Sequence, residues 1–189
     1  MKKSNLENFY RENIIDILSK ELKISNRMEV PKLNKIVLNM GLGDAKDNKN
    51  SLQQAVEELT SITGQKPVIR KSKKAISNFK IRQNDPVGVS VTLRKKKMYE
   101  FLERFIAIVS PRIRDFRGFS SKGFDGMGNY NFGINEQVVF PEINYDKVNA
   151  IRGLNLTFVT SAQDDSSAFK LLDSFGFPFR KTSSDNNQG

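Results

Sequence analysis

The sequence has 189 residues, which is enough for one domain with a sizeable core. Its 31 Lys and Arg residues exceed its 21 Asp and Glu residues, so the expected partner is a polyanion, either nucleic acid or a membrane surface. The lack of His and Cys excludes a Ser-His-Asp triad, a thiolate nucleophile, disulfides and the usual zinc ligands. Because the chain shows neither a long apolar run nor a signal-peptide pattern, we expect a cytosolic or organelle-internal protein.

Periodic apolar residues predict both helices and strands. In chain order the pattern indicates a helix at residues 6–22, a strand at 35–43, a helix at 51–63, strands at 67–71 and 87–94, a helix at 97–110, strands at 137–140 and 154–162, and a helix at 166–174. Asn5 is the expected N-cap of the first helix, and Gly64 is expected to end the second.

This order of elements lacks the regular spacing of βαβ units. It predicts an α+β fold in which helices pack on one face of an antiparallel β-sheet. The pattern contains no internal repeat and no long linker, so we expect a single domain over residues 1–181. The polar residues 182–189 are expected to form a disordered tail.

Nearly all of the excess positive charge falls in residues 70–97. This segment holds ten basic residues and one acid, whereas the rest of the chain holds 21 basic and 20 acidic residues. We therefore expect a single basic surface, which RKKK at residues 94–97 extends.

The first part of this segment, RKSKKAISNFKIRQ at residues 70–83, is predicted to be a long basic loop, or a distorted helix tip, between two strands. Six like charges repel one another, which favours a polyanion partner over a merely solvated face. The apolar residues Ala75, Ile76, Phe79 and Ile81 are expected to anchor the base of the loop to the core rather than to stack on nucleobases.

A glycine-rich stretch at residues 111–130 carries a second group of basic residues. These are Arg112, Arg114, Arg117 and Lys122, interspersed with Gly118, Gly123, Gly126 and Gly128. The stretch predicts a flexible loop whose backbone N–H groups can approach phosphates closely. The glycine spacing does not match a dinucleotide-binding motif.

Three acids, Glu136, Glu142 and Asp146, are the best candidates for a Mg²⁺ site of a nuclease. Pro141 and the mixed spacing give them no convergent geometry, so a dispersed acidic surface is the preferred interpretation. We therefore predict a protein without catalytic activity, metal or cofactor.

Several long motifs, in the order in which they occur along the chain, resemble those of one protein family. They are GQKPVIRKSKKAISNFKIRQ, VTLR, PRIRDFRGFSSKGFDGMGNYNFGINEQVVFPEINYDKV, RGLNLTFVTSA and FGFPFRK. From about Phe9 to Lys181 the chain is similar to the bacterial-type large-subunit ribosomal protein five. Members of that family fold as an antiparallel sheet with helices on one side, bind 5S ribosomal RNA, and attach it to the central protuberance of the large subunit. The resemblance thus implies a ribosome of the bacterial cytoplasm or an organelle matrix.

The resemblance also assigns roles to individual residues. It implies 5S rRNA contacts for Asn39, Gln65, Lys66, Thr92 and Arg94. It implies that the basic loop, with Lys71, Lys73, Lys74, Lys80 and Arg82, reaches the elbow of the P-site tRNA. It places Glu136, Glu142 and Asp146 toward a basic small-subunit protein, in an intersubunit bridge. Large-subunit rRNA and neighbouring central-protuberance proteins are further implied partners.

Two other function classes remain as alternatives. The first is a free-standing RNA- or DNA-binding protein that uses the same basic loop without a ribosome. The second is a membrane-surface protein held by lysines, which is disfavoured because the basic loop lacks the amphipathic helical stripe needed for interfacial binding, so no membrane partner is expected.

Overall fold

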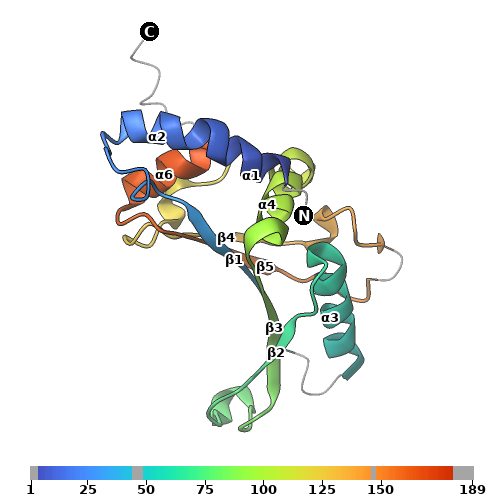
Figure 1. Ribbon diagram of the computed structural model, residues 1–189. Coiled ribbons are helices and arrows are strands. Elements are labelled where there is room, and N and C mark those ends of the chain that lie inside the picture. The colour runs from blue at the N-terminus through green and yellow to red at the C-terminus, as the bar shows by residue number, and fades with distance from the viewer. Residues whose placement is uncertain (1–3, 44–48, 146–147, 181–189) are drawn as a thin grey trace.

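A five-stranded antiparallel sheet runs through the computed structural model, which describes residues 4–43, 49–145 and 148–180. The strand order is β2-β3-β1-β5-β4. The strands are β1 Leu33–Gly41, β2 Val68–Lys71, β3 Pro86–Leu93, β4 Tyr130–Ile134 and β5 Leu154–Thr160. The helices lie on one side of this sheet (Figure 1), which confirms the predicted α+β architecture.

The helical segments fall close to the predicted ranges. The N-terminal helix consists of α1 Asn5–Phe9, the π-helical turn η1 Tyr10–Ile14 and α2 Ile15–Glu21; the others are α3 Lys49–Thr63, α4 Lys95–Arg104 with its continuation η3 Phe105–Val109 and α5 Ser110–Arg112, and α6 Asp165–Ser174. Short 3-10 turns are η2 Ser77–Phe79, η4 Ser121–Gly123 and η5 Gln137–Val139.

The helix ends follow the chemistry of their capping residues. Gly64 adopts a left-handed φ of 63° directly after α3, as predicted for a residue that ends a helix. The predicted N-cap Asn5 is wrong by one position, because the hydroxyl of Ser4 accepts the hydrogen bond from the backbone N–H of Glu7 at 3.2 Å. Ser4 has the extended backbone that an N-cap requires, whereas Asn5 is already helical.

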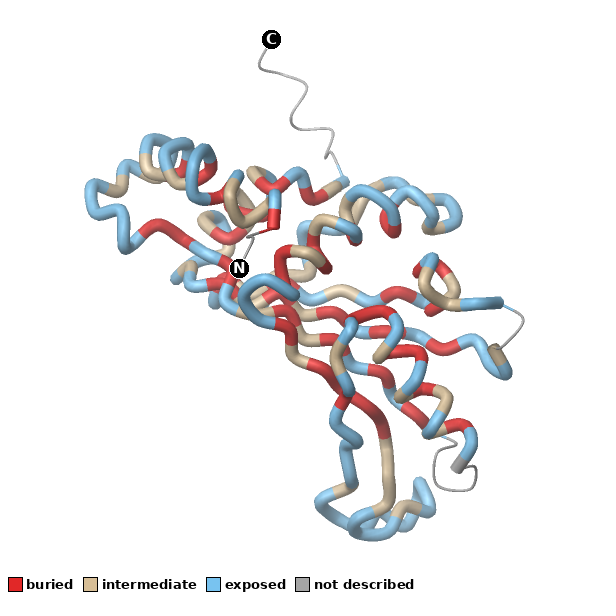
Figure 2. Tube along the Cα trace, turned by 45° about the vertical axis from the view of Figure 1, so that its right-hand side comes forward, coloured by how far each residue is buried: buried red, intermediate tan, exposed pale blue. Residues whose placement is uncertain are grey.

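One core joins the covered face of the sheet to the helices (Figure 2). Alternate residues of β1, among them Ile36, Leu38 and Met40, are fully buried beneath the helices. Burial of each such side chain stabilises the fold by roughly 1.5–3 kcal/mol. Phe105 packs among many aromatic rings, with Phe177 stacked 6.1 Å away. The alternation that buries one set of strand residues leaves the other set on the open face.

The strand predicted at residues 137–140 is wrong. Residues 137–139 form the 3-10 turn η5, and the amide of Gln137 is buried, where it donates to the carbonyl of Ala150 at 2.7 Å. The fourth strand of the sheet is instead β4, inside the glycine-rich stretch. Tyr130 and Ile134 alternate inward there with outward residues such as Gly133, a pattern that the surrounding glycines obscured.

A buried polar cluster attaches α3 to the rest of the domain. The guanidinium of Arg152 lies 3.9 Å from the carboxylate of Glu58 and donates to the hydroxyl of Ser51 at 2.9 Å. All three residues are buried. Burial raises the pKa of Glu58, and the charge of Arg152 opposes that shift. The cluster thereby connects the segment before β5 to α3, and the turn after α3 carries Gln65 and Lys66.

Candidate nucleic-acid interface

The face of the sheet away from the helices carries small polar side chains. Strand register places Asn39 of β1 beside Ser90 of β3 and Asn155 of β5. The next row places Thr92 and Thr157 on either side of Val37. Amide and hydroxyl groups from three strands therefore lie on this face, where Asn39 and Asn155 are exposed and Ser90 is buried.

Hydrogen bonds between neighbouring strands organise this surface further. The hydroxyl of Thr157 donates to the side-chain oxygen of Asn131 on β4 at 2.7 Å. The guanidinium of Arg70 on β2 donates to the hydroxyl of Ser90 at 2.6 Å. Such bonds fix the direction of each side chain, so the open face presents a preformed set of donors and acceptors.

The structure brings together the five residues predicted to contact 5S rRNA. Asn39 and Thr92 lie on the open face, while Arg94 is exposed directly after β3. The side-chain amide of Gln65 donates to the backbone carbonyl of Thr92 at 3.3 Å, which holds the turn after α3 against β3. Lys66 is exposed in the same turn. Together the five residues form one patch around the end of β3.

The turn that carries Gln65 is fixed by basic side chains of α4. Lys97 donates to the carbonyl of Gly64 at 2.8 Å, and Arg104 donates to the carbonyl of Ile62 at 2.9 Å. These bonds satisfy carbonyl groups at the C-terminus of α3, where positive charge is favourable. Lys97 therefore has a structural role in addition to its charge.

Sequence reasoning missed several members of the open face. They are Asn131, Asn155, Thr157 and Ser90, together with Arg70, which donates a hydrogen bond to Ser90. Alternation within LNLTFVT already separates Asn155 and Thr157 from the buried leucines. Their position beside Asn39, however, follows only from strand pairing, which a single sequence does not specify.

The basic loop, here residues 72–85, projects beyond the sheet from the ends of β2 and β3 (Figure 1). The first two residues of the predicted loop, Arg70 and Lys71, belong to β2 instead. Near the tip, the backbones of Ile76 and Ile81 exchange hydrogen bonds of 2.9 and 3.1 Å. The side chains predicted to contact tRNA, those of Lys71, Lys73, Lys74, Lys80 and Arg82, are all exposed.

The apolar residues of the loop do not anchor it to the core, and that prediction is wrong. Phe79 is 72% exposed and Ile76 is 46% exposed. The loop projects beyond the end of the sheet (Figure 2), and these two side chains remain largely in solvent, although Phe79 and Ile81 line a cavity together with Leu42. An aromatic ring among exposed lysines is instead the arrangement of a platform for stacking on nucleobases.

The basic residues at 72–85 and at 94–97 lie at opposite ends of β3, and Arg70 of β2 lies between them, opposite Gly88. Residues 72–85 adjoin the first residue of β3, whereas Arg94 and the lysines after it follow its last residue. Eight residues of strand separate these ends by roughly 27 Å, at about 3.4 Å per residue. That distance exceeds the roughly 8 Å Debye length at physiological salt, so a charge at one end of β3 is largely screened from a charge at the other end.

The glycine-rich loop does not offer its backbone N–H groups to phosphates in the predicted way. The N–H groups of Gly126 and Gly128 donate to the carboxylate of Asp165 at 3.0–3.1 Å. Asp125 accepts from the N–H groups of Met127 and Asn129. Hydrogen bonds from the Asn129 side chain and these backbone groups hold the pKa of Asp125 below its ordinary value. These donors are already used by acids of the chain itself.

The three predicted bridge acids have different surroundings. Glu136 is exposed next to η5, while Glu142 forms an ion pair with Arg104 at 3.4 Å. Asp146 lies outside the described residues. Within residues 4–43, 49–145 and 148–180, no three acids or other ligating groups converge on a possible metal position. None of the helices in those ranges is long and apolar enough to cross a lipid bilayer.

A polar open sheet face and a basic loop are typical of an RNA-binding protein. Residues 26–82 match the family model described as ribosomal protein L5, and residues 86–179 match the model that describes the C-terminus of the same ribosomal family.

Comparison with individual proteins agrees with the family models. Over 94% of its length the chain is 55% identical to large ribosomal subunit protein uL5 of Geobacter sulfurreducens and 53% identical to that of Cupriavidus metallidurans, covering 99% and 98% of those proteins. It is 54% identical to the uL5 protein of a Psychrobacter species over the same share. The chain belongs to the uL5 family of ribosomal proteins, so it is a structural protein of the ribosome rather than an enzyme.

Proposed function

We propose that this protein binds 5S rRNA and attaches it to the central protuberance of the large ribosomal subunit. The single observation that carries the proposal is the open sheet face, where Asn39, Thr92 and Asn155 lie together on three paired strands. Their amide and hydroxyl groups suit ribose 2′-hydroxyls and base edges, while Lys66 and Arg94 at the border suit phosphates.

The basic loop serves a second RNA in this proposal, the elbow of the P-site tRNA. The lysines at its surface suit contacts with the phosphate backbone, which do not depend on the identity of the tRNA. Phe79 at the tip adds a ring that can stack on an exposed base or base pair without reading its sequence. The loop is thus suited to hold any tRNA at this position.

The proposal includes an intersubunit bridge to a basic small-subunit protein. Glu136 supports this role because its carboxylate is on the surface. Glu142 supports it less directly, since its ion pair with Arg104 already offsets its charge. Large-subunit rRNA and neighbouring proteins of the central protuberance complete the proposed set of partners.

Binding of the purified chain to 5S rRNA tests the first part of this function. If about four to six phosphates are neutralised, a log-log plot of affinity against salt should have a slope of roughly −3 to −5. The control is a random duplex of equal length. Affinity for 5S rRNA no greater than for that duplex would contradict specific recognition.

Cosedimentation distinguishes the ribosomal role from a free-standing RNA- or DNA-binding protein. We expect the protein to remain with the large subunit after a moderate-salt wash, because contacts from two RNA surfaces and a protein bridge act together. Complete release from the subunit, with retained affinity for free RNA, would favour the free-standing alternative.

A further inference from the structure

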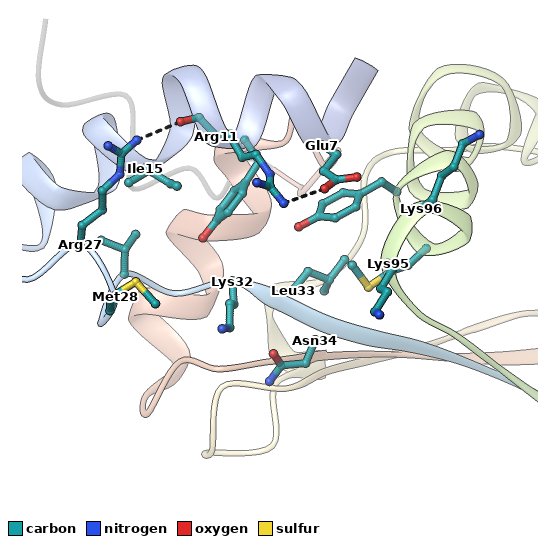
Figure 3. Close-up of a pocket in the computed structure, with 14 residues that line it drawn as sticks. Glu7, Arg11, Ile15, Arg27, Met28, Lys32, Leu33, Asn34, Lys95 and Lys96 are labelled. Atoms are coloured by element: carbon teal, nitrogen blue, oxygen red, sulfur yellow. Dashed lines mark hydrogen bonds and ion pairs between the residues drawn. The ribbon is translucent and has the colours of Figure 1, made fainter. Parts of the chain in front are cut away.

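A groove with a positively charged rim lies between the N-terminal helix, the start of β1 and the start of α4 (Figure 3). Its volume is about 800 Å³. Its basic residues are Arg11, Arg27, Lys32, Lys95 and Lys96. Neither the open face nor the loop includes these side chains, and the N-terminal helix lies outside the residues that match the family models.

The floor and walls of the groove are apolar. Leu33 and Met98 are buried there, and Ile15 and Val30 contribute further aliphatic surface. Met28 lines the groove with 83% of its surface exposed. A methionine is flexible enough to pack against side chains of various shapes, which suits a binding surface.

The charge around the groove is strongly unbalanced. Five basic side chains and one carboxylate, that of Glu7, line it, which leaves a net charge of +4. Glu7 pairs with Arg11 at 2.9 Å, and Arg27 donates to the backbone carbonyl of Arg11 at 3.2 Å. Lys96 pairs with Glu100 at 3.4 Å, in an exposed position where such a pair is weak.

Two of the basic residues remain available for a ligand. Within the part of the chain that the structure describes, Lys32 and Lys95 form no ion pair with an acid. Lys95 also has a left-handed backbone, with a φ of 51°, at the first position of α4. Strained backbone of this kind is concentrated at binding sites, because the surrounding structure must hold it in place.

The chemistry of the groove favours a peptide over RNA. Its two aromatic residues, Tyr10 and Tyr99, are only 8% and 7% exposed, and both pack against Phe175, so neither ring has a free face for a nucleobase. The hydroxyl of Tyr10 is also occupied, since it donates to the carbonyl of Pro31. An apolar floor offers little to ribose or phosphate, whereas aliphatic and aromatic side chains of a peptide can be buried on it.

We propose that this groove binds an acidic segment of a neighbouring protein in the ribosome, with an apolar side chain of that segment inserted between the N-terminal helix and α4. Carboxylates of the segment pair with Lys32 and Lys95 at the rim. The inserted side chain packs chiefly on Met28 and Ile15, the least buried apolar side chains of the lining. Burial of the apolar side chain supplies affinity, and the surrounding charge selects acidic partners and speeds their association.

Fluorescence anisotropy of the purified full chain tests the chemistry. The probe is a labelled twelve-residue peptide of aspartate and glutamate with a central leucine and phenylalanine. Lys32→Glu with Lys95→Glu should weaken its binding at least tenfold. The matched control, Lys20→Glu with Lys122→Glu, makes the same change of charge at exposed positions outside the groove and should have a much smaller effect. Replacing the two apolar residues of the peptide by serine should also weaken binding.

The same experiment has outcomes that would overturn the proposal. An equal loss in both double variants would mean that the peptide responds to net charge alone. Binding of a twelve-nucleotide oligouridine more tightly than the peptide would identify an RNA site, if that binding is lost in Lys32→Glu with Lys95→Glu but not in the control variant. The neutral pair Lys32→Gln and Lys95→Gln should show a smaller loss in the same direction, and it provides the test if the glutamate variant fails to fold.

Crosslinking inside assembled ribosomes tests occupancy. A photoreactive amino acid replacing Met28 should crosslink to a protein segment in which mass spectrometry finds acidic residues flanking an apolar one, and the same group at Met127 should not capture that segment. A crosslink from Met28 to rRNA, to a segment without acids, or to nothing at all would contradict the proposal.

Discussion

The two basic regions at opposite ends of β3 look alike in sequence and differ in structure. The loop at residues 72–85 holds its cations in solvent around an exposed aromatic ring, Phe79. The region that begins at Arg94 lies against the body of the domain, where Lys97 caps α3 and Lys95 lines an apolar groove.

Charge density therefore does not identify a partner until the surroundings of each charge are known. Solvated cations beside a free ring suit a nucleic acid, because phosphates and base faces meet both features. Cations around an apolar floor suit a protein segment instead. A third environment, the open face with Asn39 and Thr92, depends on hydrogen-bonding groups rather than charge.

The largest expected effect is on the free energy of unfolding, which a substitution in the body of the domain should lower far more than a substitution in the loop. Arg152→Ala should lower the free energy of unfolding by about 3–5 kcal/mol, because Glu58 is left buried without its partner. Lys73→Gln, in the solvated loop, should change it by less than about 0.5 kcal/mol. Urea denaturation measures both changes. Equal losses of stability in the two variants would show that the loop contributes to the fold as much as the buried cluster does.

The second prediction concerns the open face. Asn39→Ala with Thr92→Ala should weaken 5S rRNA binding by roughly 1–3 kcal/mol in total, because RNA groups lose their hydrogen bonds. Filter binding measures the change, with Asn13→Ala and Ser166→Ala on the helices as the exposed control. A loss of the native circular dichroism spectrum would show that Asn39 and Thr92 serve the fold instead.

The smallest expected effect concerns the ring at the loop tip. Phe79→Ala should weaken tRNA retention by about 1–2 kcal/mol, toward the lower end of the range for loss of base stacking. Phe79→Tyr should preserve retention, since the stacking face remains. Stability should be unaffected, because the side chain is exposed. Retention that is equally weak in both variants would show that the ring does not act by stacking.

Much of the sheet could be predicted from the sequence, because alternating apolar residues give strands such as β1, β3 and β5 a period of two. The strand β4 was missed because glycines flank and interrupt its three inward residues. The apolar run around Val138 has the pattern of a strand but forms a turn, in which the Gln137 side chain bonds to backbone outside the sheet.

The functional surfaces were predictable only in part, for a physical reason. Asn39 and Thr92 followed from a resemblance, but their neighbour Asn155 becomes visible only when register pairs strands far apart in the chain. The exposure of Phe79 follows from the projection of the loop beyond the sheet, which composition does not indicate. The groove combines three distant segments, so no local pattern predicts it.

In the proposed function the loop and the open face serve different RNAs. Its most direct test is a variant with Lys71→Gln, Lys73→Gln, Lys74→Gln and Lys80→Gln, assembled into large subunits and measured for 5S rRNA content and for P-site tRNA dissociation. We expect normal 5S rRNA content and faster tRNA dissociation, with a defect that grows as salt screens the remaining contacts. Loss of 5S rRNA with unchanged tRNA lifetime on the assembled ribosomes would contradict it.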